Sequence, residues 1–446
     1  MIKNKSFVNP EVFVNKTQEE EYFKKYDITH KKMSNEIRLT GMSKRVADIN
    51  SSNINFVFSS GSYNDPKGKE GIHHMFEHLV MNRIQKNPKS VDIYKNAYTS
   101  QTKLIVELDG TSNTKVKSYG VWPMIPDVIS VLKSPFENDT ESFLQSEVNV
   151  VLHELAEQNT KPQYHNNIFL YKCLYDKSNP LRSDTLGTKK SLTSISLSDL
   201  EKIANRVFVP KGLTVSVFAD GGSNISKSAL MEIESELVNF PRENTKPLKV
   251  NQDLTDNINP NLKPGDTFEN DDGLKNELVT VNFAWVLPSI DLTSHAFSLN
   301  RVTQGLNENL LRYTRKKGIS YSSSVYSISH RSSQIIIFTL TMKKGIPLSE
   351  IKTKLFPEIR DHVIFAINDN ELAYINNKEK LIQEAVLMPT RSRFYWLNYG
   401  YDYYGKVIDA DAIKNLYKSV SLLDLKHWRD KLLEIEPIAI VSGDIS

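Results

Sequence analysis

The sequence predicts an α+β protein built from two similar domains, each a mainly antiparallel sheet packed against helices. Three observations support this fold class. The chain has 446 residues, more than one ordinary hydrophobic core holds, because domains average roughly 150 residues. Alternating strands that are adjacent in sequence are mixed with amphipathic helices, a pattern that favours antiparallel sheets with helices on one face. Two patterns also recur in the second half of the chain in the same order.

The recurring patterns indicate a duplicated architecture. LSDL at residues 197–200 and LLDL at residues 422–425 each open a helical stretch that leads into a short apolar strand, and their offset is 422 − 197 = 225 residues. A second pair agrees with the first: NINFVFSSGS begins at Asn53, and the similar strand LVTVNFAWVLPS begins at Leu278. Either pair alone is a common pattern, but two pairs at nearly one offset predict two copies of one domain.

The boundary between the copies follows from composition. The segment between the halves is rich in Pro, Asn and Asp and poor in apolar residues, as a surface linker should be. We therefore predict a first domain over residues 1–235, a linker over 236–273 and a second domain over 274–446.

Individual elements follow from hydrophobic period. Residues 54–58 and 103–110 read as strands, and residues 141–158 read as a helix with apolar residues at positions 144, 148, 151, 152 and 155. The aromatic stretch FYWLNYGYDYY at residues 394–404 is predicted to pack in the second domain and between the domains.

Composition excludes several classes of function. Hydrophobic residues make up 39% and charged residues 24% of the chain, so most of it can fold, and the formal charge of 56 − 53 = +3 does not indicate a nucleic-acid partner. The single cysteine, Cys173, excludes an internal disulfide and a thiolate zinc cluster and is expected to be buried. The first residues carry no secretory apolar core, and no stretch approaches 18 apolar residues. A soluble, cytoplasmic chain with no membrane segment is expected.

The segment GIHHMFEHLVMN at residues 71–82 carries the chemistry. His74 and His78 are spaced i, i+4, so on a helix both imidazoles project from one face and can converge on a metal ion. Glu77 sits beside that face and can reach a water molecule at the metal. Zinc suits two imidazoles because it binds neutral ring nitrogens and tolerates an open fourth position. The alternative is a surface histidine cluster on an amphipathic helix.

A third ligand is expected from the helix predicted at 141–158. Glu147 and Glu154 are seven residues apart, two helical turns, and share a face, while Glu157 follows Glu154 at i+3. A carboxylate from this helix would complete a site with two histidines and one glutamate and leave one position for water. Spacing alone does not choose between Glu147 and Glu154, and each of the three could instead be a solvated surface charge.

The sequence resembles the pitrilysin/insulinase metallopeptidases, in particular their mitochondrial-processing-peptidase-like branch of two-domain subunits. His74-Met75-Phe76-Glu77-His78, with Glu154 following 154 − 78 = 76 residues later, is similar to the inverzincin signature. Four further segments match the family's patterns in the expected order: VFSSGSYND at 57–65, Asn96-Ala97-Tyr98-Thr99, LGTKKSL at 186–192, and Val441-Ser442-Gly443-Asp444.

The resemblance implies a role for each matching residue. His74, His78 and Glu154 would bind one zinc ion per chain, and Glu77 would act as general base. Glu147 would orient a ligand histidine. A peptide substrate would extend along the strand that contains Asn96 and Ala97.

One element departs from the family's pattern. Members that contact substrate through the second domain carry an arginine and a tyrosine at a fixed spacing near a helix end. Here Tyr321 stands in the expected Gly-x-x-Tyr setting, but Thr314 occupies the position seven residues earlier, flanked by Arg312 and Arg315. Either arginine could substitute, or the pair could be lost. Because some dimers of this branch divide zinc and the Arg–Tyr pair between two chains, the departure favours a dimer, in particular a heterodimer with a related chain.

The sequence therefore predicts a zinc-dependent endopeptidase that cleaves short or unstructured peptides. Removal of leader segments from ribosomally made peptides and general oligopeptide degradation are both open. The alternative is a non-catalytic, peptide-binding core subunit of a heterodimeric processing peptidase, although such subunits typically lose the metal motif that is complete here.

Overall fold

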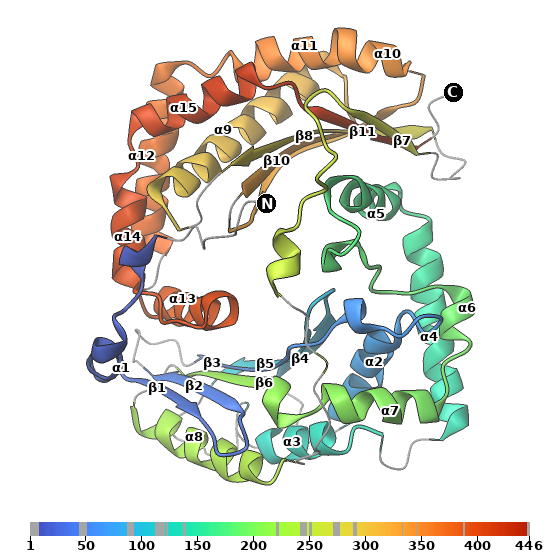
Figure 1. Ribbon diagram of the computed structural model, residues 1–446, viewed down its shortest axis with the longest axis vertical. Helices are drawn as coiled ribbons and strands as arrows, with labels where there is room; N and C mark the ends of the chain where they lie inside the picture. The colour runs from blue at the N-terminus through green and yellow to red at the C-terminus, as the bar shows by residue number, and fades with distance from the viewer. Residues whose placement is uncertain are drawn as a thin grey trace.

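The structure is a computed structural model of two sheets that face each other, with most helices on their outer sides (Figure 1). It describes residues 9–43, 51–86, 93–111, 121, 124–136, 140–219, 223–240, 248, 252–270, 277–288, 292–331, 333–345, 347–386 and 389–443. Within these residues no helix is long and apolar enough to cross a membrane.

The first sheet has six strands in the order β1-β2-β6-β3-β5-β4, and only the β2–β6 pair is parallel. Alternation explains its two faces: Ile54, Phe56 and Phe58 of β3 point into the core, while Asn53 and Asn55 point to the opposite face. The strands are β1 (Ile28–Lys32), β2 (Arg38–Ser43), β3 (Ser51–Phe58), β4 (Tyr94–Thr99), β5 (Leu104–Thr111) and β6 (Leu213–Ala219).

The second sheet repeats this arrangement with five strands in the order β7-β11-β8-β10-β9, and its β7–β11 pair is again parallel. The strands are β7 (Thr267–Asn270), β8 (Leu278–Pro288), β9 (Ser322–Ser329), β10 (Ser333–Lys343) and β11 (Ile438–Ser442). Strands β3 and β8, and strands β6 and β11, occupy equivalent places in the two sheets. These are the two pairs that the sequence repeats predicted, and the α+β class with two similar, mainly antiparallel sheets is confirmed.

Helices cover the outer face of each sheet and form one large hydrophobic core per half. The helices of the first half are α1 (Glu19–Tyr26), α2 (Ile72–Gln85), α3 (Ile125–Lys133), α4 (Glu141–Asn159), α5 (Pro162–Leu174), α6 (Lys189–Leu192), α7 (Leu197–Val207) and α8 (Ser223–Val238). Those of the second half are α9 (Ser294–Lys317), α10 (Leu348–Glu350), α11 (Phe356–Ile359), α12 (Asp369–Val386), α13 (Pro389–Tyr404), α14 (Ala410–Ser419) and α15 (Leu422–Glu434). Helix α4 confirms the helix predicted over residues 141–158.

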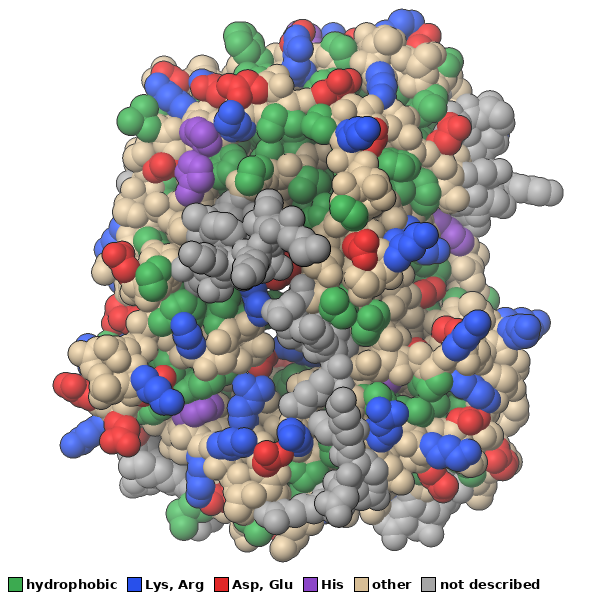
Figure 2. Space-filling view, in the orientation of Figure 1, with side chains coloured by type: hydrophobic (Ala, Val, Ile, Leu, Met, Phe, Trp, Pro, Cys, Tyr) green, Lys and Arg blue, Asp and Glu red, His purple; other side chains and the backbone are tan. Residues whose placement is uncertain are grey.

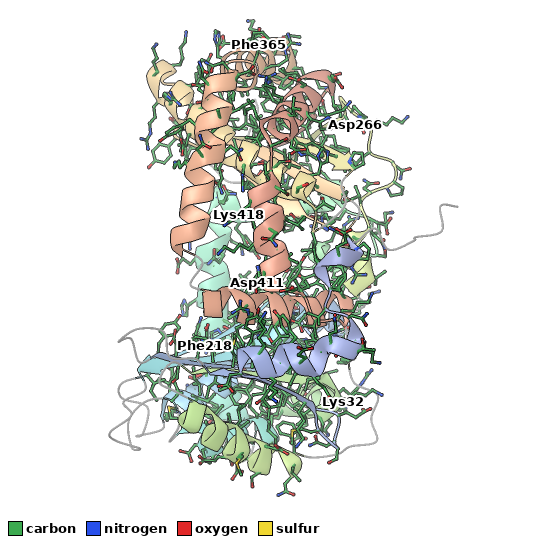
Figure 3. All side chains as sticks on the ribbon, turned by 90° about the vertical axis from the view of Figure 1, so that its left-hand side faces the viewer. Lys32, Phe218, Asp266, Phe365, Asp411 and Lys418 are labelled. Atoms are coloured by element: carbon green, nitrogen blue, oxygen red, sulfur yellow. The ribbon has the colours of Figure 1, made fainter. Side chains whose placement is uncertain are left out.

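Each half also places one helix on the inner face of the other half's sheet (Figure 1). Helix α5 packs on the second sheet, where Leu170, Leu174 and the expected buried Cys173 join one apolar cluster with Ile337. Helix α13 lies on the first sheet, where Phe394 contacts Phe218 at a ring distance of 5.7 Å. Figure 3 shows α14 continuing upward from Asp411, near the first sheet, to Lys418. The aromatic stretch 394–404 therefore packs between the halves, as predicted.

The predicted linker contains regular structure. Residues 241–247, 249–251 and 271–276 lie outside the described residues, as does Asp444 of the closing motif. Between them, Thr267–Asn270 form β7, which pairs with β11 in the second sheet. Composition misses this strand because β7 is short and lies at the sheet edge, where few apolar residues are required.

Candidate metal centre

Helix α2 begins in a tight backbone contact that fixes the position of its histidines. Gly71 precedes the helix with a φ of 93°, and a side chain there would meet the carbonyl oxygen of Leu186 at 2.6 Å. Gly187, with a φ of 74°, approaches the carbonyl of Glu70 from the facing segment, and a β-carbon would lie 2.1 Å from that oxygen. Only glycine combines this conformation with this proximity. The motif segment 186–192 thus packs directly against the start of the histidine helix.

The structure brings His74, His78 and Glu154 together. One ligand atom from each lies within 4.8 Å of the others. The Oε2 atom of Glu154 is 3.6 Å from His74 Nε2 and 3.5 Å from His78 Nε2. Ligands about 2.1 Å from a tetrahedral zinc ion would be about 3.4 Å apart. The carboxylate oxygen therefore lies at about the distance from each nitrogen that two ligands of one zinc ion have.

Glu147 lies on the other side of the His78 ring. Its Oε2 atom is 3.8 Å from His78 Nδ1, and its Oε1 atom accepts a hydrogen bond of 3.0 Å from Asn82 Nδ2. The ring nitrogen that faces Glu154 is thus the opposite one. This difference separates the two glutamates, which spacing alone could not do, and it places Glu147 where a carboxylate can orient a metal-binding imidazole.

Burial tunes the ionisable groups of the cluster. Burial and, to a lesser extent, the charge of His78 together lower the pKa of His74 to about 4, so the imidazole is neutral, the form that binds metals. Burial opposes the charge on His78, but a hydrogen bond to Glu154 and the charge of Glu77 raise the pKa of His78 overall. A hydrogen bond from His78 in turn lowers the pKa of Glu154.

Glu77 lies beside the three candidate ligands. Its Oε2 atom is 4.0 Å from His74 Nε2. Burial raises the pKa of its carboxyl to about 7, although hydrogen bonds from the side chain and backbone of Thr99 favour the ionised form. Thr99 ends strand β4 and so connects the predicted base to the predicted substrate strand. The sequence pattern includes Thr99 in the motif at residues 96–99 but does not reveal its proximity to Glu77.

A second group of residues beneath the cluster was missed. His73 is fully buried; its Nδ1 atom lies 2.5 Å from Asp65 Oδ1 and its Nε2 atom 2.8 Å from Ser60 Oγ. Asp65 also accepts a hydrogen bond from the backbone N–H of Gly71. These contacts hold the first turn of α2. The run of two histidines at 73–74 was the available signal, but spacing does not reveal the partner of a buried histidine.

The predicted substrate strand is in place. Strand β4 is the edge strand of the first sheet and pairs only with β5 in that sheet. The Ala97 side chain is buried in the core, so Ala97 could contact a peptide only through its backbone, whereas Asn96 is partly exposed. Because one edge of β4 lacks a partner strand in the described sheet, it offers N–H and C=O groups to an added strand.

The Arg–Tyr element is not assembled at the cluster. Arg312 and Arg315 are exposed on α9, and Arg312 donates a hydrogen bond to Asn309. The Tyr321 side chain is 86% exposed, and its backbone N–H is bonded to the carbonyl of Thr341. Thr314 points inward and is bonded to Ser323. In the described part of the chain no contact joins either arginine or Tyr321 to the three candidate ligands.

The donor set fits zinc. It consists of two imidazole nitrogens and one carboxylate oxygen, partly shielded from solvent, with Glu77 next to an open side. The buried Nδ1 atom of His74 has no hydrogen-bond partner among the described residues. The orientation of this ring therefore depends on its packing and on the group that binds Nε2.

Comparisons with known proteins agree with this geometry. No family model matches the chain. An uncharacterized zinc protease of Rickettsia bellii is 20% identical over 431 residues, which cover 91% of this chain and 95% of that protein. A protease from Helicobacter pylori has a TM-score of 0.68 at 14% identity and covers 94% of this chain and 99% of that one. A peptidase M16 inactive domain from Pseudomonas fluorescens has a TM-score of 0.70 at 12% identity, covering 93% and 97%. The fold is that of the M16 peptidases, which confirms the resemblance of this chain to the pitrilysin/insulinase family.

Proposed function

We propose that this chain is a zinc-dependent endopeptidase with one zinc ion per chain, bound by His74, His78 and Glu154. The observation that carries the proposal is the spacing of the three ligand atoms, with the Glu154 oxygen 3.6 and 3.5 Å from the two imidazole nitrogens. A chance cluster of charged side chains would not be expected to have Glu77 beside it and the Glu147 carboxylate on the other side of the His78 ring.

Each residue has a defined part in hydrolysis. When bound, zinc polarises the scissile carbonyl and lowers the pKa of a nearby water molecule. Glu77 accepts the proton of that water as it attacks, and later delivers the proton to the leaving amine. Thr99, at the end of β4, favours the ionised form of the Glu77 carboxylate. Glu147 orients the His78 ring.

The substrate is an extended peptide. Adding a strand to the open edge of β4 would align the peptide backbone beside Glu77, since Thr99 of the same strand contacts that residue. Edge pairing requires an unfolded segment, so short or unstructured peptides are preferred to folded proteins. Leader removal from a ribosomally made peptide is one use of such an activity, and oligopeptide degradation is another. We infer that this peptide cleavage takes place in the cytoplasm.

A second subunit is part of the proposal. The exposed Tyr321 ring and the displaced arginines leave the second domain without an assembled substrate contact. We infer that the chain works as a dimer, in particular with a related chain that supplies this contact.

On the face shown in Figure 2, acidic and basic side chains are interspersed, so that face offers no continuous basic surface of the kind that binds nucleic acid.

The alternative function is a non-catalytic core subunit that binds peptide. One of the similar structures is named an inactive domain, so the fold alone does not distinguish the two. The complete set of His74, Glu77, His78 and Glu154 favours the enzyme, because a core subunit has no need to keep a general base next to three ligands.

Metal analysis combined with one substitution tests the proposal. Protein purified without chelator should contain close to one zinc ion per chain. Glu77→Gln keeps the ligand set, so zinc content should stay the same while peptide hydrolysis falls by several orders of magnitude. Absence of zinc in the wild-type protein, with no activity recovered on adding zinc, would rule out the zinc-dependent peptidase function. Wild-type hydrolysis rates in Glu77→Gln would refute the mechanism.

A further inference from the structure

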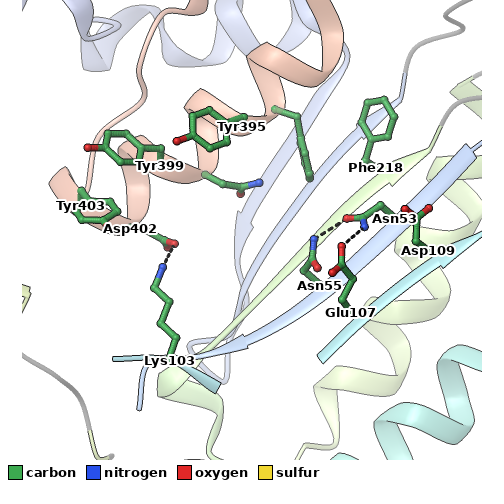
Figure 4. Close-up of a pocket in the computed structure, with 12 residues that line it drawn as sticks. Asn53, Asn55, Lys103, Glu107, Asp109, Phe218, Tyr395, Tyr399, Asp402 and Tyr403 are labelled. Atoms are coloured by element: carbon green, nitrogen blue, oxygen red, sulfur yellow. Dashed lines mark hydrogen bonds and ion pairs between the residues drawn. The ribbon is translucent and has the colours of Figure 1, made fainter. Parts of the chain in front are cut away.

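Outside the metal cluster, a pocket of about 610 Å³ lies between the inner face of the first sheet and helix α13. It lies at the contact between the two halves, a place where ligand sites are common. Figure 4 shows strands of the first sheet on one side of the pocket and the tyrosine-bearing helix on the other. Neither the metal ligands nor Glu77 line it.

The two walls differ in chemistry. The sheet wall carries carboxylates and amides: Glu107 and Asp109 of β5 beside Asn53 and Asn55 of β3. The amide of Asn53 donates a hydrogen bond of 2.8 Å to Glu107, which fixes this carboxylate toward the pocket (Figure 4). The helix wall carries rings spaced four residues apart, so they lie on one face of α13: Tyr395, Tyr399 and Tyr403.

The charge in the pocket is unbalanced. Lys103 and Asp402 form an ion pair of 2.7 Å that joins sheet and helix at one end. Glu107 and Asp109 at the other end have no cationic partner among the described residues. Two such carboxylates at i, i+2 on one strand repel each other, so a cation bound between them and the tyrosine rings would be favoured.

The pocket is also in register with the predicted substrate strand. Glu107 lies directly opposite Asn96 of β4, and Asp109 lies opposite Tyr94. Thr99, which contacts Glu77, is three residues from Asn96, so the pocket begins about 10 Å along the strand from the base. A peptide paired with the free edge of β4 would be separated from β5 by one strand, so a long side chain extending across β4 would reach the pocket about three to five residues from the bond being cleaved.

We propose that this pocket binds a basic side chain of the substrate, arginine in preference to lysine. A guanidinium group can bond to Glu107 and Asp109 with its edge while its flat face lies on a tyrosine ring, which an ammonium group cannot do equally well. The pocket is larger than one side chain and leaves room for the residues next to the arginine. This inference rests on the proposed peptidase function and names its substrate class.

The test uses peptides that share one neutral sequence and carry a single arginine at successive positions, each matched by a peptide with citrulline, which has nearly the same shape but no charge. The wild-type enzyme should cleave the best arginine peptide at least tenfold more efficiently than its citrulline match, mainly through KM. The double variant Glu107→Gln, Asp109→Asn should reduce this ratio to below about threefold, mainly by raising the KM of the arginine peptide. Glu269→Gln, an exposed carboxylate on β7, is the matched control and should leave the ratio unchanged.

Direct binding separates this inference from the proposed function. The Kd of a fluorescent arginine peptide for the zinc-loaded Glu77→Gln protein should rise about tenfold when the pocket carboxylates are also neutralised. If the wild-type protein cleaves no peptide but this change in Kd is found, the peptidase function fails and the pocket stands. If peptides are cleaved with equal efficiency with arginine or citrulline at every position, or if the double variant keeps the preference, the pocket assignment is wrong. Tyr399→Ala tests the contact between the guanidinium group and the tyrosine ring, and this variant should reduce the preference for arginine over lysine.

Discussion

The Nδ1 atom of His73 lies 2.5 Å from the Oδ1 atom of Asp65, in a fully buried contact directly beneath the candidate metal ligands. Asp65 is a shared acceptor, because the backbone N–H groups of Gly71 and His73 also point at it. A single carboxylate therefore ties the first turn of α2 to the preceding loop. The residue after His73 is the candidate ligand His74, so the position of this candidate ligand depends on this contact.

Replacing Asp65 should loosen the metal site as well as the fold. Asp65→Ala leaves the His73 ring and two backbone donors without an acceptor, and an unsatisfied buried donor costs about 1–3 kcal/mol. We expect a lower urea midpoint and a several-fold weaker zinc affinity, measured by competition with a chromophoric chelator. The control is Asp176→Ala, which removes an exposed aspartate that bonds to Ser178. An unchanged zinc affinity in Asp65→Ala would show that the contact does not position His74.

The third ligand can be tested with a matched pair on one helix. Glu154→Gln should weaken zinc retention strongly, because the amide is a poor ligand in place of a carboxylate. Glu157→Gln changes the same residue type three positions later, where the side chain is exposed and pairs with Lys161. It should retain zinc like the wild-type protein. Zinc content after dialysis against a weak chelator measures both, and equal loss in the two variants would argue against Glu154 as a ligand.

His30 should make stability depend on pH. Its ring stacks on Tyr401 of α13 at 3.8 Å and bonds to Thr40. Burial, with a smaller effect of Arg38, lowers the pKa of His30 to about 4, below the value of about 6.5 in an unfolded chain. Between these values the unfolded state binds more protons, so the free energy of unfolding falls as pH drops from 6.5 towards 4.

His30→Gln removes this titration and keeps a polar group near Thr40. The urea midpoint of the wild-type protein should fall more between pH 7 and pH 5 than that of the variant, by an amount on the order of 1 kcal/mol in unfolding free energy. Both proteins contain the same other histidines, so their difference isolates His30. Parallel pH curves for the two proteins would contradict the prediction.

The sequence predicted local features better than long-range contacts. Periodicity was sufficient for β3, for α4 and for the duplicated strand pairs, because each is determined by residues within one element. The i, i+4 spacing of His74 and His78 likewise placed two candidate ligands on one face. Periodicity shows that a face is buried but not which element covers it, so the packing of α5 on the second sheet was beyond reach. For α13, the aromatic residues indicated packing between the domains but not the strands that they contact. The pocket at Glu107 depends on that packing.

The same distinction applies within the metal site. Glu147 and Glu154 share a helical face, and only the three-dimensional approach of α4 to α2 shows that they meet different nitrogens of His78. The partners of His73 lie 8 and 13 residues upstream, in a loop whose course no periodic pattern specifies.

The last prediction concerns the second subunit. The Tyr321 ring is 86% exposed, so in the isolated chain its hydroxyl is not held where it could position a substrate, and positioning contributes strongly to catalysis. We expect Tyr321→Phe to change the turnover of the isolated chain by less than about twofold. Adding a related chain with an intact arginine and tyrosine should raise turnover in both proteins equally, measured as peptide hydrolysis across a titration of the second chain. A sharp loss of activity in Tyr321→Phe alone would instead show that the chain uses its own second domain. Full activity of the chain alone, with no gain from any related chain, would rule out the partner.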